Sequence, residues 1–267
     1  MTSASDERTG QNHIQGLERG LAVLQAFDAE HPDRTTTELA TATQLSRPVV
    51  RRILLTLQRL GYVATSDGRW TLTPRVLSIG QHYTATHALT EVAQPHLMRL
   101  AEQTGESSTL ATLDDNEVVY IARMPVRRVL SVTVAPGTRA AAHATSLGRV
   151  LLAWESTERI ERIITESGLP GLTPYTVTDP VQFREILSTV RHQGWSMVVG
   201  EREEGLISLS APIRDHHGHV IAAVASSTST GRASPEGLRE DVVPVLVDTA
   251  KRISRELGNH VPGTPLA

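Results

Sequence analysis

The chain has 267 residues, 39% of them hydrophobic, which suffices for one large domain or two modest domains with cores of their own. It contains no cysteine, which excludes disulfides, thiolate metal sites, iron–sulfur clusters and cysteine nucleophiles. The formal net charge is −3, yet residues 1–75 carry nine arginines against eight acidic residues, whereas residues 76–267 carry 17 basic against 21 acidic residues. The first part of the chain therefore suits a polyanionic partner better than the rest.

No segment predicts insertion into a membrane. No stretch approaches the roughly 20 apolar residues that cross a bilayer. The opening segment MTSASDERTGQNH is polar and lacks the basic flank and apolar run of a secretory signal. We therefore expect a cytoplasmic protein without a membrane partner.

Two helices are predicted first along the chain. The apolar residues of the first recur at the spacing of one helical face: Leu17, Leu21, Leu24 and Phe27. In the second, Thr35 and Glu38 have the spacing of a capping box, and Leu39 and Ala42 continue an apolar face. The two helices precede a short turn that contains Gln44.

A third helix follows, and its arginines point outward. Ser46 is a good N-cap, and Pro48 stands in the first turn, where its missing N–H is no loss. One stripe is apolar: Val50, Ile53, Leu54 and Leu57. The exposed start and the remaining faces carry Arg47, Arg51, Arg52 and Arg59. No acidic residue stands between Glu38 and Asp67 to offset these arginines.

The segment YVATSDGRWTL after this helix predicts a hairpin around Asp67-Gly68, with Arg69 at its tip. Helix, short helix, basic helix and hairpin make a winged helix-turn-helix over residues 13–75. The alternative is a helical hairpin of some bundle with a solvated arginine face. On the first interpretation, the residues expected to contact double-stranded operator DNA are Ser46, Arg47, Pro48, Arg51, Arg52 and Arg69.

The remainder of the chain predicts an α+β domain. We expect a linker helix over residues 76–88 and a second domain over 89–260. Hairpin strands are predicted around Asp114–Asn116, and the run VLSVTV is predicted to be a strand closed by Pro136-Gly137. Helices at 146–154, 157–167 and 180–193, three further strands and a C-terminal helix from Pro235 complete the pattern.

An anion site is predicted at the helix that begins at Ser146. Thr145 is placed to cap this helix, which leaves its first N–H groups free for a carboxylate, with His143 just outside. In LISLSAPI, two sets of side chains alternate along the strand. One set is apolar and consists of Ile207, Leu209, Ala211 and Ile213, and the other carries two hydroxyls and consists of Leu206, Ser208 and Ser210. The arginines expected to pair with an acidic ligand are first Arg123 and Arg139, then Arg127 and Arg128.

The segment TTTELATATQLSRPVVRRILLTLQRLGYV resembles the DNA-binding half of the IclR-type bacterial transcription regulators. The likeness extends to about residue 257 through AHATSLGRVLLA, HQGW and EREEGLISLSAPIRDHHGHVIAAVASS, which are similar to the effector-binding domain of that family. The segments RMPVRRVLSVTVAPGTR and LTPYTVTDP are most similar to the branch that controls aromatic-acid and β-ketoadipate catabolism. Gln44 and Val199 depart from the usual glycine in the turn and the frequent acid before EREEG.

The resemblance implies a winged helix-turn-helix joined by a linker helix to a GAF-like effector-binding domain. It implies that a small aromatic or dicarboxylic acid regulates DNA binding, and that the protein works as a homodimer or a dimer of dimers. By resemblance, the effector cavity is lined by Leu206, Ser208, Ser227 and the turn residues His143, Ala144, Thr145 and Ser146.

Other chemistry is not predicted. The histidines His216, His217 and His219 cluster in a turn and are read as exposed residues rather than metal ligands, and no cofactor motif is present. Glu201, Glu203 and Glu204 lack an accompanying nucleophile or base, so no catalytic residue is assigned. The competing hypothesis is an enzyme or carrier of small acids without operator-specific DNA binding. Salt-sensitive retention on DNA would separate the two.

Overall fold

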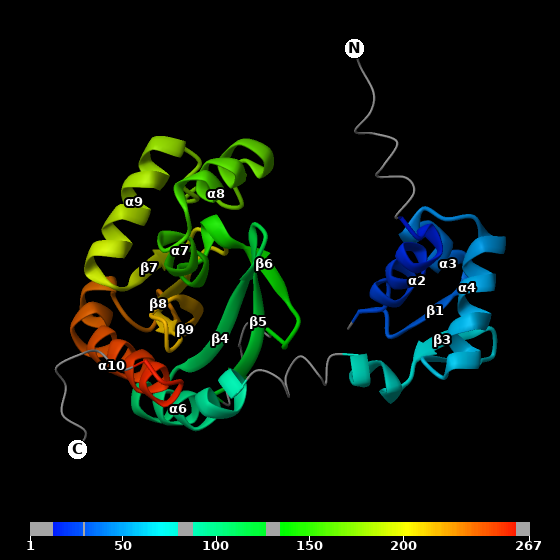
Figure 1. The fold of residues 1–267 in the computed structure, drawn as a ribbon, viewed down its shortest axis with the longest axis horizontal. Helices are drawn as coiled ribbons and strands as arrows, with labels where there is room; N and C mark the ends of the chain where they lie inside the picture. The colour runs from blue at the N-terminus through cyan, green and yellow to red at the C-terminus, as the bar shows by residue number, and fades with distance from the viewer. Residues whose placement is uncertain (1–12, 29, 80–87, 127–133, 260–267) are drawn as a thin grey trace, which may run out of the picture. The chain divides into compact units, whose positions relative to one another are not determined.

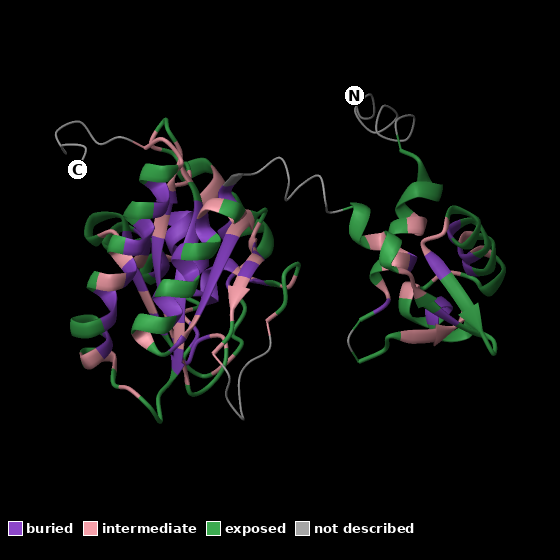
Figure 2. Ribbon diagram, turned by 90° about the horizontal axis from the view of Figure 1, so that it is seen from below, coloured by how far each residue is buried: buried purple, intermediate pink, exposed green. Residues whose placement is uncertain are grey.

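The computed structural model describes residues 13–28, 30–79, 88–126 and 134–259. The chain divides into two compact units, residues 1–86 and 87–267 (Figure 1). Each unit contains its own set of buried residues (Figure 2). Of the linker helix predicted over 76–88, residues 80–87 lie outside the described residues. Residues 77–79, directly after the 3₁₀ turn Pro74–Val76, are helical, and α6 begins at the other end of the predicted range.

The first unit is a winged helix-turn-helix. Its elements are α2 (Gln15–Gln25), β1 (Asp33–Thr35), α3 (Thr36–Thr43), α4 (Arg47–Leu60), β2 (Val63–Ser66) and β3 (Arg69–Leu72). The strands form an antiparallel sheet of order β1-β3-β2. The predicted capping box is present, since Thr35 Oγ1 accepts from the Glu38 N–H while Glu38 bonds the Thr35 N–H. Sequence patterns gave no sign of β1, which has only three residues.

The helices of this unit meet around Val23, Leu39, Val50, Leu54 and Trp70. The spacing of leucines marks α2 correctly as a helix, but two of those leucines do not belong to the core: the exposed fraction is 61% at Leu17 and 45% at Leu21. α2 instead packs through Val23, and Phe27 packs just beyond its end. An apolar strip of α2 is therefore left uncovered within the unit.

The second unit is an α+β domain built on one antiparallel sheet. Its strands are β4 (Ser107–Asp114), β5 (Glu117–Met124), β6 (Arg139–Ala141), β7 (Ser196–Val199), β8 (Leu206–Arg214) and β9 (Val220–Ser229). Their order is β6-β5-β4-β9-β8-β7. The run VLSVTV predicted as a strand lies outside the described residues except for Val134, which is not in a strand, and the described edge strand β6 follows it instead.

Helices cover both faces of this sheet (Figure 1). One face packs on α6 (Ala88–Thr104) and α10 (Pro235–Glu256) through a core that contains Ile207, Leu209 and Ile213. The other face packs on α7 (Ser146–Ala153), and α9 (Pro180–Gln193) packs on α7 from outside. α8 (Thr157–Arg162) continues into the π turn Ile163–Ser167, so the predicted helix over 157–167 consists of two pieces. The alternation predicted for β8 is confirmed, because its apolar residues face α6 and α10.

Only a residue without a Cβ fits at position 148, where α7 lies against the backbone of the preceding 3₁₀ turn, Ala142–Ala144. A Cβ at this position would overlap the backbone of Ala142, which cannot swing aside as a side chain would. We expect Gly148→Ala to destabilise the second unit by about 1–3 kcal/mol, the range for forced overpacking. Gly237→Ala, in the first turn of α10, is the matched control, because its Cβ would meet only Ser234 Oγ at 3.4 Å. Equal thermal stability of the two variants would contradict this account.

Gln44 adopts a left-handed conformation at the end of α3, with φ of 55°. A residue with a Cβ is strained there, so Gln44→Gly should stabilise the first unit by about 0.5–1 kcal/mol despite the greater freedom of glycine in the unfolded chain. Gln58→Gly, at an exposed position inside α4, should instead destabilise it by about 1 kcal/mol. Urea denaturation of both variants measures the difference, and a loss of stability in Gln44→Gly would refute the strain.

Candidate functional site

α4 presents its arginines to solvent. Arg47, Arg51, Arg52 and Arg59 are all exposed, whereas Val50, Leu54 and Leu57 are buried on the opposite stripe. Within the part of the chain that the structure describes, none of these four arginines has an ion-pair partner. The helix therefore carries four uncompensated charges, as a surface that binds phosphates requires.

The start of α4 is open. Ser46 has the extended backbone of an N-cap, but its hydroxyl does not bond the first N–H groups of the helix, and Pro48 occupies the first turn. Ser46, Arg47 and Pro48 are exposed together at this end. A phosphate at such a helix end would accept hydrogen bonds from the first N–H groups and from the Ser46 hydroxyl, and it would be attracted by the positive end of the helix dipole.

The wing turn has the predicted geometry, but Arg69 is engaged within the protein. Asp67 and Gly68 both have positive φ, as a type I′ turn requires. Arg69 forms ion pairs with Asp33 and Glu38 at 2.5 and 3.5 Å instead of extending from the tip. This guanidinium would have to leave two carboxylates to reach DNA, so the wing offers less free positive charge than the sequence indicates.

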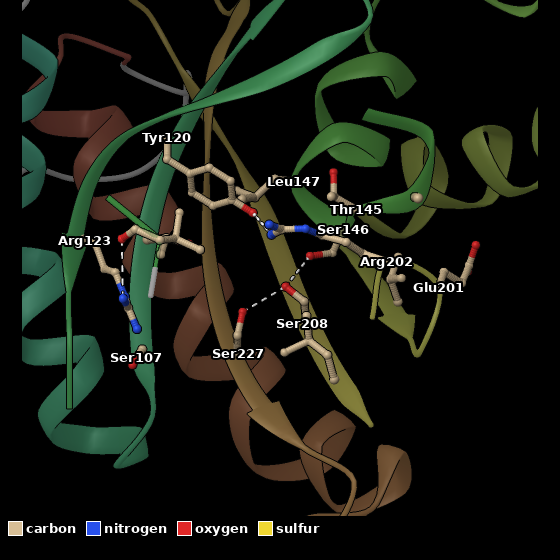
Figure 3. Close-up of a pocket in the computed structure, with 15 residues that line it drawn as sticks. Ser107, Tyr120, Arg123, Thr145, Ser146, Leu147, Glu201, Arg202, Ser208 and Ser227 are labelled. Carbon is tan, nitrogen blue, oxygen red and sulfur yellow. Dashed lines mark hydrogen bonds between the residues drawn. The ribbon is translucent and has the colours of Figure 1, made fainter. Parts of the chain in front are cut away.

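The second unit contains a cavity of about 60 Å³, with a wall that is mostly apolar, between the sheet and the start of α7 (Figure 3). Hydroxyls dominate the polar part of that wall, with two guanidinium groups and one carboxyl group. The lining residues are Ser107, Thr109, Tyr120, Arg123, Val134, Ala144, Thr145, Ser146, Leu147, Val198, Glu201, Arg202, Leu206, Ser208 and Ser227.

Three serines of the cavity wall form one hydrogen-bonded group together with Ser210, which lies behind the wall. Ser146 Oγ donates to Ser208 Oγ at 2.8 Å and shares a hydrogen bond of 2.7 Å with Ser210 Oγ. Ser208 and Ser227 face each other on β8 and β9, and their hydroxyls are 3.0 Å apart. These hydroxyls are both donors and acceptors, so a polar ligand can replace one partner without leaving another unsatisfied.

The predicted cap of α7 is confirmed. Thr145 Oγ1 accepts the N–H of Gly148 at 3.0 Å, and the first helical bond runs from the Arg149 N–H to the Thr145 carbonyl at 3.0 Å. The N–H groups of Ser146 and Leu147 precede that bond, and a helix leaves such groups unpaired. Both residues line the cavity, so the positive end of α7 faces the space where a ligand would lie.

A β-bulge aims two side chains of β5 into the cavity. Tyr120 pairs with Ala111 and Ala122 pairs with Leu110, so Ile121 between them has no partner in the ladder. In a regular strand, Tyr120 and Arg123 would point to opposite faces of the sheet. The extra residue restores them to the same face, and both line the cavity.

A buried ion pair holds the far wall. Arg149 Nη2 donates to Glu201 Oε2 at 2.6 Å, and this oxygen also accepts the Val177 N–H at 2.9 Å. Arg149 Nε donates to the His143 carbonyl at 3.1 Å. The exposed fraction of the side chain is 4% for Arg149 and 9% for Glu201, so the pair ties α7 to the segment after β7 inside the protein.

Two of the predicted ligand contacts lie elsewhere. His143 is buried and does not line the cavity; its Nε2–H donates to the Pro170 carbonyl at 2.9 Å, and burial lowers its pKa. Arg139 lies on the exposed edge of the sheet and forms ion pairs with Glu117 and Asp114 at 2.6 and 2.8 Å. Arg127 and Arg128 lie outside the described residues. The other predicted positions do line the cavity: Arg123, Ala144, Thr145, Ser146, Leu206, Ser208 and Ser227.

Sequence reasoning missed Tyr120 and Arg202. Tyr120 was missed because strict alternation along β5 assigns its side chain to the sheet face opposite that of Arg123, and only the bulge brings both to the same face. Arg202 lies inside the run EREEG, where the acidic residues dominated the interpretation. Its Nη1 donates to Tyr120 Oη at 3.0 Å.

No group of three metal-ligating side chains occurs among the described residues. The histidines of the turn at 216–219 contact one another and Asp215 at the surface. Over the same described ranges, no helix is long and apolar enough to cross a membrane.

Two family models match the chain: the IclR helix-turn-helix domain over residues 16–67 and the bacterial transcriptional regulator IclR C-terminal domain over residues 81–255. The Pca regulon regulatory protein of Pseudomonas putida is 38% identical over 91% of this chain and 84% of its own length. The p-hydroxybenzoate hydroxylase transcriptional activator of Acinetobacter baylyi is 37% identical over 94% of both. A solved IclR homologue from Microbacterium hydrocarbonoxydans, complexed with 4-hydroxybenzoate, superposes with a TM-score of 0.81 at 27% identity, covering 91% of this chain and 99% of that one. The chain belongs to the IclR family of bacterial transcriptional regulators.

Proposed function

We propose that this protein regulates catabolic genes by binding operator DNA through α4 and a small organic acid in the cavity of the second unit. The observation that carries the proposal is the presence in one chain of a helix with four uncompensated exposed arginines and a separate cavity lined by hydroxyls and guanidinium groups. Its relatives support an aromatic acid, since two are named for the pca genes and p-hydroxybenzoate and a third is bound to 4-hydroxybenzoate. A regulator of this kind would act in the cytoplasm and catalyse no reaction.

On DNA, the start of α4 would fix the protein on the backbone and the middle of the helix would read bases. Ser46, Arg47 and Pro48 suit a phosphate at the helix end, while Arg51 and Arg52 stand one turn further along. Arginine can donate two parallel hydrogen bonds to a guanine edge in the major groove. Arg69 contributes only if binding releases it from Asp33 and Glu38.

A homodimer explains the uncovered strip of α2. A groove of about 440 Å³ lies between α2 and α4. Its wall contains Leu17, Leu21, Leu24 and Ile53, together with Arg19 and Arg52. Exposed leucines of this kind are costly in water, and a second copy of the chain would bury them. Two copies would also place two winged helices on paired half-sites, because one such module makes few contacts.

The cavity of about 60 Å³ is smaller than typical ligand pockets of roughly 300–1,000 Å³. A ring-sized acid therefore has to displace part of the wall, so it binds an expanded conformation better than the one described. A ligand shifts a conformational equilibrium only by such a difference in affinity. We infer that expansion of the cavity is the event that changes DNA binding.

Arg51→Ala and Arg52→Ala should each weaken binding to a duplex selected by the parent protein from a random library, by about 1–3 kcal/mol where the arginine reads a base. An arginine that contacts only phosphate should lower the salt slope by about one unit. Arg252→Ala is the control, since Arg252 pairs with Asp248 on the surface of α10. Unchanged binding of both α4 variants at physiological salt would refute the interface.

Ser208→Leu should abolish binding of the acid that most stabilises the parent in a thermal-shift panel, because it fills the cavity and breaks the hydroxyl network. Ser208→Ala should lose about 1 kcal/mol of affinity. Ser188→Leu, on the exposed face of α9, controls for the added leucine. Both Ser208 variants should keep DNA binding; Ser208→Leu should lose the response to ligand, whereas Ser208→Ala should respond at a higher ligand concentration. A normal response in Ser208→Leu would place the effector site elsewhere.

A further inference from the structure

The strand pairing of the first unit fixes the direction of Arg69. Arg69 on β3 pairs with Thr35 on β1, and Asp33 stands two residues before Thr35. Side chains two residues apart on a strand share a face of the sheet, so Asp33 is a diagonal neighbour of Arg69. The guanidinium donates from Nε to Asp33 Oδ1 at 2.5 Å and from Nη2 to the Asp33 carbonyl at 3.2 Å. Two hydrogen bonds to one residue therefore hold Arg69 against β1.

A second carboxylate lies beside the same guanidinium. Arg69 Nη2 is 3.5 Å from Glu38 Oε2. Glu38 closes the capping box of α3, where hydrogen bonds from the N–H and the hydroxyl of Thr35 lower its pKa. Glu38 is therefore ionised at neutral pH, and one guanidinium serves two carboxyl groups.

The charges of this group matter more for binding than for folding. The exposed fraction of the side chain is 44% for Arg69, 46% for Asp33 and 48% for Glu38, and ion pairs as exposed as these stabilise a fold only slightly. The first helix of a helix-turn-helix crosses the DNA backbone, and Glu38 stands in the first turn of that helix, α3. Without Arg69, two carboxylates would repel the phosphates there.

We propose that Arg69 stays paired when DNA binds and acts as the counter-ion of Asp33 and Glu38, so that these carboxylates do not oppose the approach of the duplex. This inference rests on the proposed function and gives Arg69 an indirect role in it. A released Arg69 would gain one contact with DNA and leave two carboxylates facing the phosphates. Arg69 is thus a positioning residue, which provides a neutral surface beside the free arginines of α4.

A double-mutant cycle between Arg69 and Asp33 separates a counter-ion from a direct contact. Fluorescence anisotropy measures the affinity of the full-length protein for the duplex that the parent selects. Arg69→Ala should weaken binding by about threefold to tenfold, and this loss should shrink as salt is added. Asp33→Asn should change the affinity of the parent by less than about twofold, but it should recover most of the loss in Arg69→Ala, because it removes the unpaired carboxylate.

A direct contact predicts a different pattern. If Arg69 leaves Asp33 to bind DNA, Asp33→Asn frees it in advance and should strengthen the parent at least as much as it strengthens Arg69→Ala. A purely structural role of Arg69 predicts no recovery, because Asp33→Asn cannot restore the lost hydrogen bonds between β1 and β3. Either pattern overturns the inference.

Asp67→Asn is the matched control, since it removes a carboxylate from the same hairpin. Asp67 accepts a hydrogen bond from Ser66 and forms no ion pair within the described residues, and asparagine tolerates its positive φ of 53°. Its effect should be equal in the parent and in Arg69→Ala. If Asp67→Asn restores Arg69→Ala as well as Asp33→Asn does, net charge alone decides and the pair has no special role. Circular dichroism of each variant excludes unfolding as the cause.

The outcomes also separate this inference from the function on which it rests. If Arg51→Ala and Arg52→Ala bind DNA as tightly as the parent, the interface on α4 is wrong and the role of Arg69 falls with it. If those variants weaken binding while Asp33→Asn recovers nothing in Arg69→Ala, only the counter-ion is wrong.

Discussion

The buried pair between Arg149 and Glu201 holds together the elements around the cavity of the second unit. Each charge loses its hydration, and replacing only one partner would leave an uncompensated charge inside the protein at a cost of about 3–5 kcal/mol. The pair joins three segments. Arg149 lies on α7, Glu201 lies in the segment after β7, and Glu201 also accepts the N–H of Val177 in the loop before α9. The start of α7 and Arg202 are both placed by this connection, and both border the ligand space.

The chain uses arginine in three physically different ways. On α4 the guanidinium groups stay hydrated and unpaired, which suits the reversible, salt-dependent binding of phosphates. Arg149 is enclosed and fully paired, and its role is to fix geometry. Arg123 and Arg202 are half-buried, and the hydrogen-bond partners that the structure gives them are neutral. The chain contains only one lysine, Lys251, so nearly all its basic side chains are arginines. The surroundings of each arginine, and not its residue type, therefore distinguish these roles.

Local patterns predicted the parts of the fold that local interactions decide. The capping box at Thr35, the outward arginines of α4, the turn at Asp67-Gly68 and the cap at Thr145 follow from neighbouring residues alone, and the structure confirms them. The β5 bulge could not be predicted from β5 alone. It arises from the pairing with β4, in which two consecutive residues of β4 pair with the two residues of β5 on either side of Ile121. The partners of Arg69 and Arg139 could not be predicted either, since Asp33 and Asp114 lie 36 and 25 residues away along the chain. Leu17 and Leu21 have the spacing of a core face, but spacing does not tell which surface will cover them.

The small volume of the cavity also has a kinetic meaning. On the proposed function, a ring-sized acid needs more space than the cavity offers, so its binding requires movement of the wall and should be slower than diffusion allows. The hydrogen bond between Arg202 and Tyr120 is part of that wall. A sensor with slow entry and slow exit averages its signal over time. If the protein regulates as proposed, DNA binding would respond to a sustained concentration of the acid and not to a brief rise.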